Sequence, residues 1–202
     1  MFTGHAESME KYLYIVTIVS AVTWGAMELC LIWRDQARRM GRTYRDQGTR
    51  SLIIASVLAG FVISAFLAKA VAAYPLLHIP GEPWTAGAGL ALAWSGIAIR
   101  YRAVVELGES FRTTVEVEDG QTVVSTGPYK LIRHPSYTGL LLAAAGFGLA
   151  GYSWPGLIVC VLLPLSAMLQ RIRVEESELV EVLGDPYQAY RRQTKRLVPG
   201  LW

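Results

Sequence analysis

Long runs of apolar residues dominate the chain. Tyr12–Trp33 and Ser51–Tyr74 are both long enough for a transmembrane helix, which needs about 20 mostly apolar residues. Each run carries one interior charge, Glu28 in the first and Lys69 in the second. Trp84–Tyr101 is shorter and rich in glycine and alanine. Because small residues let neighbouring helices approach closely, we expect this third run to be buried among other helices.

Two further apolar runs, residues 136–152 and 155–170, lie on either side of Ser153-Trp154. Each is slightly short for a full span. Their uncharged connection contains Gly151 and Pro155, so we interpret the two runs as a tight helical hairpin within the membrane. The chain is thus predicted to be all-α: one polytopic membrane domain over residues 1–202, with about five transmembrane segments.

Basic residues are distributed unevenly over the segments between these runs. Six of the arginines lie between Arg34 and Arg50, five Lys or Arg lie in residues 100–133, and six more follow Gln170, whereas residues 75–83 hold none. With five segments, all the basic regions face one side, which the positive-inside rule assigns to the cytoplasm, with the N-terminus outside. A basic block also suits nucleic acid, but between two apolar segments a cytoplasmic loop is the simpler interpretation.

The composition agrees with a bilayer protein. Hydrophobic residues make up 52% of the chain and charged residues only 17%, below the quarter that is usual in soluble domains. The two cysteines, Cys30 and Cys160, sit inside apolar runs and have no zinc-ligand spacing, so neither a metal nor a disulfide is expected.

Residues 103–135 are more than a connector. Two β-prone runs surround Asp119-Gly120 in "FRTTVEVEDGQTVVSTGPY", which predicts a small cytoplasmic β-hairpin. Further on, Pro135 disfavours a helical conformation at His134 and suits the first turn of a helix.

Arg133 and His134 are therefore predicted at a helix N-terminus, an end that attracts anions such as a carboxylate. An alternative is that Arg133 and Lys130 bind lipid phosphate and that His134 only caps the helix.

A second polar cluster begins where the last apolar run ends. A C-terminal helix is predicted from Gln170 to Leu183, and Arg171, Glu175 and Glu178 share one of its faces. These side chains form either a site or a solvated, salt-bridged extension. Glu28 is open in the same way, because an intramembrane carboxylate is either functional or paired with an arginine of the first basic loop.

The two clusters together resemble the isoprenylcysteine carboxyl methyltransferase family. The resemblance rests on "GPYKLIRHPSYTG", then "RIRVEESELVEVLG", then "YQAYRRQTKRLVPG", and it covers about Phe111 to Trp202. It implies a membrane enzyme that transfers a methyl group from S-adenosyl-L-methionine to a carboxylate on a lipophilic substrate, which enters from among the membrane lipids.

The resemblance also implies which residues act. Residues 103–135 and 171–202 become cytoplasmic cofactor-binding elements. Arg171 becomes the substrate-binding residue for the carboxylate and, with Glu175, the catalytic pair. The cofactor-binding positions are Glu116, Gln121, Thr122, Val123, Val124, Tyr129, His134, Pro135, Ser136, Tyr137 and Glu175.

Three other functions fit parts of this pattern. A phospholipid or amine N-methyltransferase uses the same donor. NADPH-dependent membrane sterol reductases carry a similar Arg-His-Pro element, but typically have tryptophan where this chain has Tyr187. A non-catalytic membrane scaffold would leave both polar clusters unexplained.

Overall fold

The computed structural model describes residues 2–37, 48–71, 73–81, 83–108 and 123–201. Within these ranges the regular structure is entirely helical, with two isolated β-bridges. The elements in order are α1 (Phe2–Ala37), α2 (Thr49–Val71), η1 (Pro75–Leu77), α3 (Trp84–Leu107), η3 (Gly127–Lys130), α4 (Pro135–Ala150), α5 (Trp154–Leu183) and α6 (Asp185–Gln193). The all-helical prediction is confirmed for this part of the chain. The β-hairpin around Asp119-Gly120 falls outside the described residues and stays a prediction.

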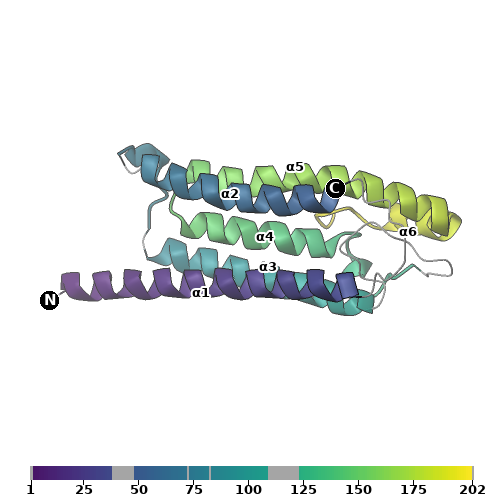
Figure 1. Ribbon diagram of the computed structural model, residues 1–202, viewed down its shortest axis with the longest axis horizontal. Helices are drawn as coiled ribbons and strands as arrows, with labels where there is room; N and C mark the ends of the chain where they lie inside the picture. Colours follow the sequence, from purple (N-terminus) through teal and green to yellow (C-terminus); the bar gives the residue numbers. More distant parts are fainter. Residues whose placement is uncertain (1, 38–47, 72, 82, 109–122, 202) are drawn as a thin grey trace.

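Helices α1 to α5 lie side by side along the long axis of the molecule and alternate in direction (Figure 1). Arg171 of α5 donates to the Thr49 hydroxyl at the start of α2, and Arg100 of α3 donates to Ser136 at the start of α4. At the opposite end, the amide of Ile79 donates to the carbonyl of Tyr152 at 2.8 Å. Arg100 of α3 and Arg171 of α5 therefore lie with the starts of α2 and α4 at one end of the bundle, here called the α6 end, whereas Lys69 lies in the last turn of α2 at the opposite end.

Three described helices are long and apolar enough to cross a membrane: α2, α5 and the Lys11–Ala37 part of α1. These helices indicate an integral membrane protein. Helix α4 is apolar but has only 16 residues, and α3 is not among the candidate spans. A count of five membrane segments therefore stays a prediction, although each of the five predicted runs does form a helix.

Glycines hold α3 and α4 in backbone contact. A Cβ at Gly89 would lie 2.6 Å from the carbonyl oxygen of Gly146, and a Cβ at Gly139 would lie 2.6 Å from the backbone nitrogen of Arg100. Neither position has room for a side chain. Between these contacts, Ala93 of α3 is fully buried. The predicted burial of the glycine-rich run is confirmed for the face of α3 that meets α4, where the helices approach closely, whereas Trp84, Trp94 and Tyr101 of the same run are exposed.

The predicted tight turn between the last two apolar runs is also seen. Helix α4 ends at Ala150 and α5 begins at Trp154. Ser153 caps α5, because its hydroxyl accepts a hydrogen bond from the amide of Gly156 at 3.2 Å. Helix α5 then continues without interruption to Leu183, where Gly184 ends it with a φ of 58°.

An aromatic cluster forms the centre of the bundle. The rings of Trp24 and Phe147 stack with centroids 5.6 Å apart, and Phe61 meets both edge-on. Met168 of α5 is fully buried beside them. These contacts join α1, α2, α4 and α5, so the helices that carry the polar residues of the α6 end are packed against one another.

Candidate functional site

Residues 126–137 lead into α4 and are here called the threshold segment. Gly127 has a φ of 54°, a conformation that favours glycine, and it opens the short helix η3. His134 is the N-cap of α4 with a non-helical φ of −123°, and Pro135 occupies the first turn. The predicted conformations of His134 and Pro135 are thus confirmed. The His134 side chain, however, makes no capping hydrogen bond.

The segment after α6 folds back onto the threshold segment. The amide of Arg133 donates to the carbonyl of Lys195 at 2.7 Å, and the amide of His134 donates to the carbonyl of Arg196 at 3.0 Å. Thr138 adds a hydrogen bond from its hydroxyl to the carbonyl of Leu197. This pairing brings the C-terminal residues and the start of α4, which are far apart in the sequence, to one place.

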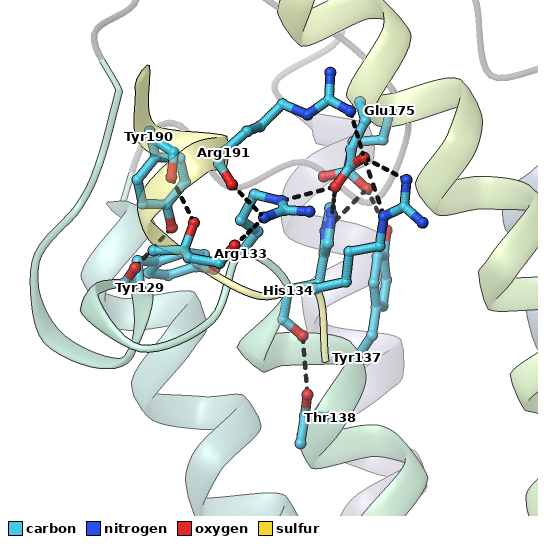
Figure 2. Close-up of polar contacts among 11 residues, drawn as sticks. Tyr129, Arg133, His134, Tyr137, Thr138, Glu175, Tyr190 and Arg191 are labelled. Atoms are coloured by element: carbon cyan, nitrogen blue, oxygen red, sulfur yellow. Dashed lines mark hydrogen bonds and ion pairs between the residues drawn. The ribbon is translucent and has the colours of Figure 1, made fainter. Parts of the chain in front are cut away.

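Tyr137 connects the two polar clusters that the sequence indicated. Its hydroxyl donates to Glu175 Oε2 at 2.7 Å and accepts from Arg171 Nε at 2.6 Å. The His134 ring stacks on it with centroids 5.5 Å apart, and Figure 2 shows His134, Tyr137 and Glu175 side by side. Arg171 is only 2% exposed, whereas the Glu175 side chain is 29% exposed. The structure therefore places a buried arginine and an accessible carboxylate on either side of one phenol.

Glu176 contacts several basic side chains, and the sequence analysis did not single it out. Its carboxylate lies 2.8 Å from Arg133 Nε, 3.1 Å from Arg196 Nη2 and 3.4 Å from His134 Nε2. Arg191 Nη2 adds a fourth contact at 3.7 Å. Because Arg133 forms this buried ion pair, the interpretation that it binds lipid phosphate is wrong. The only sequence signal was that Glu176 is one of two adjacent acidic residues.

Tyr129 is buried against α3, away from Glu175. Its hydroxyl donates to the carbonyl of Ala103 at 3.4 Å, and its own carbonyl accepts from the Tyr190 hydroxyl at 2.7 Å. Figure 2 shows Tyr129 and Tyr190 together, with Arg133 between them and Glu175. Burial raises the pKa of Tyr190 to about 12 and raises the pKa of Tyr129 as well. Both hydroxyls therefore stay protonated donors at neutral pH.

The remaining predicted site residues are placed as follows. Pro135 and Ser136 are buried in the first turn of α4, and the Ser136 hydroxyl accepts from Arg100 Nη1 at 2.7 Å. Val123 and Val124 are half-buried just before η3. Glu116, Gln121 and Thr122 lie outside the described residues, and their role stays a prediction.

Glu28 has a partner that sequence reasoning did not name. It pairs with Arg100 of α3, whose Nη2 lies 2.6 Å from Glu28 Oε2 and whose Nε also contacts the carboxylate. Trp24 Nε1 donates to the same carboxylate at 3.1 Å. Of the two alternatives for Glu28, a functional carboxylate or a partner of a first-loop arginine, the second differs from the structure, in which Glu28 of α1 pairs with Arg100 of α3.

The groups around Tyr137 suit a ligand that carries an amino group or hydroxyls, a carboxylate and an aromatic ring. The accessible Glu175 carboxylate suits an amino group or ribose hydroxyls, and the N-terminus of α4 suits a carboxylate. The stacked rings of His134 and Tyr137 suit an aromatic group. The buried Tyr187 hydroxyl has no hydrogen-bond partner among the described residues, as expected at a position that a ligand or a water completes. Among those residues, no group of His, Cys, Asp or Glu is arranged to hold a metal ion.

The fold and this cluster define an all-helical integral membrane protein with a polar site at one end of its bundle. The sequence model of the isoprenylcysteine carboxyl methyltransferase (ICMT) family matches residues 89–181, a range that contains the threshold segment and both glutamates. Over this range, just under half of its length, the chain is similar to that family.

Curated relatives carry methyltransferase names. The chain is 31% identical over 106 residues to protein-S-isoprenylcysteine O-methyltransferase of Schizosaccharomyces pombe, covering 52% of this chain and 45% of that protein. It is 31% identical over 127 residues to methanethiol S-methyltransferase of a Pseudomonas species, covering 58% and 48%. The chain thus spans about half the length of these relatives.

A solved structure shares the fold. It is the eukaryotic intramembrane Ras methyltransferase ICMT, which superposes with a TM-score of 0.69 at 20% identity. The match covers 96% of this chain and 68% of that one. At this identity the comparison shows the fold alone.

Proposed function

We propose that the protein is an S-adenosyl-L-methionine-dependent carboxyl O-methyltransferase that acts on a lipophilic, isoprenylcysteine-like carboxylate. The observation that carries the proposal is a pair of hydrogen bonds that Tyr137 makes, one with Arg171 and one with Glu175. The buried guanidinium of Arg171, which would hold the acceptor, is two hydrogen bonds from the accessible carboxylate of Glu175, which would hold the donor. The apolar part of α5 runs from Arg171 toward the opposite end of the bundle. The lipid tail of an acceptor would lie beside this part of the helix.

S-adenosyl-L-methionine, when bound, supplies an electrophilic methyl group on a sulfonium. The protein's task is then alignment and exclusion of water, because a carboxylate is already a nucleophile and needs no strong base. Arg171 would hold the acceptor carboxylate through its planar guanidinium. In the structure Arg171 Nη1 donates to the neutral Thr49 hydroxyl at 3.1 Å, and a carboxylate is the stronger acceptor for that donor.

The role of Glu175 would be to bind the donor. Its carboxylate is exposed enough to accept hydrogen bonds from an amino group or from ribose hydroxyls. Tyr137 would keep Glu175 and Arg171 in register, and His134 would present its ring beside them. Glu176, which binds Arg133 and Arg196, would keep the folded-back C-terminal segment over the start of α4.

The proposed orientation has the N-terminus outside and the site facing the cytoplasm. Its support is that basic residues from three separate regions gather at the α6 end: Arg102 near the end of α3, Lys130 in η3, and Lys195, whose carbonyl accepts from the amide of Arg133. The opposite end, at η1, lies within the stretch 75–83 that holds no Lys or Arg. Positive charge marks the cytoplasmic side of membrane proteins.

A second candidate is S-methylation of a small thiol, favoured by the likeness to methanethiol S-methyltransferase. A thiol must first lose its proton to become the nucleophile, whereas the buried Arg171 matches an acceptor that is already anionic. Methyl transfer to a neutral amine forms an ammonium product, which the same guanidinium repels, and this argues against an amine N-methyltransferase.

Calorimetry on the purified protein in detergent tests the proposal. We expect S-adenosyl-L-methionine to bind and NADPH not to bind. Binding of NADPH without any binding of S-adenosyl-L-methionine would contradict the proposal and indicate a reductase.

A further inference from the structure

The last turns of α3 hold the threshold segment at three successive points. Arg100, Ala103 and Glu106 follow one another at three-residue intervals, so they share one side of the helix. Arg100 donates to the Ser136 hydroxyl at 2.7 Å, Ala103 accepts from the Tyr129 hydroxyl, and Glu106 accepts from the Thr126 hydroxyl at 2.5 Å. The position of the threshold segment is therefore set from α3.

Arg100 is the positively charged member of this row, and it forms an ion pair with Glu28 of α1. The Arg100 side chain is 8% exposed and that of Glu28 is 22% exposed. Replacing a buried ion pair by well-packed apolar residues is often neutral or stabilising, so stability alone does not account for this pair. In a membrane protein such a pair indicates a functional role.

The guanidinium bridges two helices in a directed way. Its Nε and Nη2 face Glu28, while Nη1 faces both the hydroxyl and the carbonyl of Ser136. Ser136 lies in the first turn of α4, between His134 and Tyr137, and Tyr137 contacts Glu175. A rotation of this turn would move the aromatic rings that we propose to face the methyl donor.

We infer that Arg100 is a positioning residue for the methyl-donor site: it holds Ser136 and the first turn of α4, and Glu28 orients its guanidinium. The inference rests on the proposed function for the identity of the donor. The contact between Arg100 and the first turn of α4 can be measured without any ligand.

Amide hydrogen exchange in detergent, read by mass spectrometry on peptides that contain residues 134–139, tests the positioning itself. Arg100→Lys keeps a charge for Glu28, but one ammonium cannot reproduce the planar bridge to Ser136. We expect exchange in these peptides to become about tenfold faster, as for the loss of one charge-assisted hydrogen bond. Arg102→Lys is the matched control, because Arg102 is exposed two residues further along α3, and it should leave exchange unchanged.

The dissociation constant of S-adenosyl-L-methionine, measured by calorimetry, tests the consequence for the donor. Arg100→Lys and Ser136→Ala should each raise it about tenfold. The double variant should be no weaker than either single variant, because both remove the same contact. Ser136→Ala also keeps the test informative if Arg100→Lys fails to fold.

The outcomes separate the inference from the proposed function. A wild-type protein that bound no S-adenosyl-L-methionine would refute the proposed function, while the exchange experiment would still test the contact. Unchanged exchange in both Arg100→Lys and Ser136→Ala would overturn the inference. Additive losses of donor affinity in the double variant would also overturn it, because Arg100 would then act by a route that does not include Ser136.

Discussion

Tyr137 sits between the two charged residues that the proposed reaction needs, with one hydrogen bond to Arg171 and one to Glu175. The division of labour between these two residues is what single substitutions can test. A change of the accessible Glu175 should affect binding of the methyl donor, whereas a change of the buried Arg171 should affect binding of the acceptor.

Glu175→Gln should weaken binding of S-adenosyl-L-methionine by about tenfold, because it replaces a charged acceptor by a neutral one. The amide can still accept from the Tyr137 hydroxyl, so the fold should persist. Calorimetry measures the effect, with Glu181→Gln as the control, since Glu181 is exposed on the same helix. Equal donor affinity in Glu175→Gln and the wild type would refute the assignment of Glu175 to the donor.

Arg171→Lys should spare donor binding and lower kcat/KM for the carboxylate acceptor by about a hundredfold, because lysine cannot make a planar two-point contact. Initial rates with varied acceptor give the ratio. Arg173→Lys, at an exposed position of α5 two residues away, should behave as the wild type. Full turnover in Arg171→Lys would show that the acceptor is held elsewhere.

Part of this site followed from the sequence. The proline after His134 predicts the start of α4, and the spacing of Arg171 and Glu175 predicts that they share a helix face; both are local signals, and the structure has both features. The contacts of Glu176 were not predictable, because they join residues 43 and 20 positions apart through the folding back of the C-terminal segment. The pair of Glu28 and Arg100 spans 72 positions and depends on which helices become neighbours. Hydrophobic periodicity carries no information about that choice.

At the scale of elements, the contact between α3 and α4 fixes where the first turn of α4 lies, and that turn holds His134 and Tyr137 of the proposed site. Gly139 and Gly146 of α4 face Gly96 and Gly89 of α3 at backbone distance. The glycine content of the Trp84–Tyr101 run predicted close packing, but not that α4 would be the partner. The two helices are linked again near the α6 end through Arg100 and Ser136.

Gly139→Val should lower the melting temperature by about 5 °C or more, because overpacking at a close helix contact costs about 1–3 kcal/mol or more. The added atoms would meet the backbone of Arg100 and of Gly96. Gly87→Val is the control, since a Cβ at that position of α3 meets nothing within 4 Å. Thermal unfolding in detergent compares them. Equal melting temperatures for the two variants would contradict the described packing of α3 on α4.

At the scale of the whole molecule, the arrangement separates a polar end from an apolar body. Helix α1 exposes many large apolar side chains along its length, among them Tyr14, Val22 and Trp33, a surface that suits lipid. The proposed site residues lie at the α6 end, where most of the basic residues of the described part of the chain gather. A lipophilic acceptor with a terminal anion matches this polarity.

The orientation can be tested by cysteine labelling in intact cells or sealed vesicles. In a background that carries Cys30→Ser and Cys160→Ala, Lys195→Cys should react with a membrane-impermeant maleimide only after the membrane is opened. Leu76→Cys, at an exposed position of η1, should react from outside. The reverse pattern would invert the proposed topology.

The most direct test of the central claim is transfer of a tritiated methyl group from S-adenosyl-L-methionine to a farnesylated cysteine analogue with a free carboxylate. The account predicts a base-labile methyl ester, no product from the same compound as an amide, and loss of product in Arg171→Lys. Methylation of a small thiol or of a lipid amine headgroup, with no product from any lipophilic carboxylate, would contradict it.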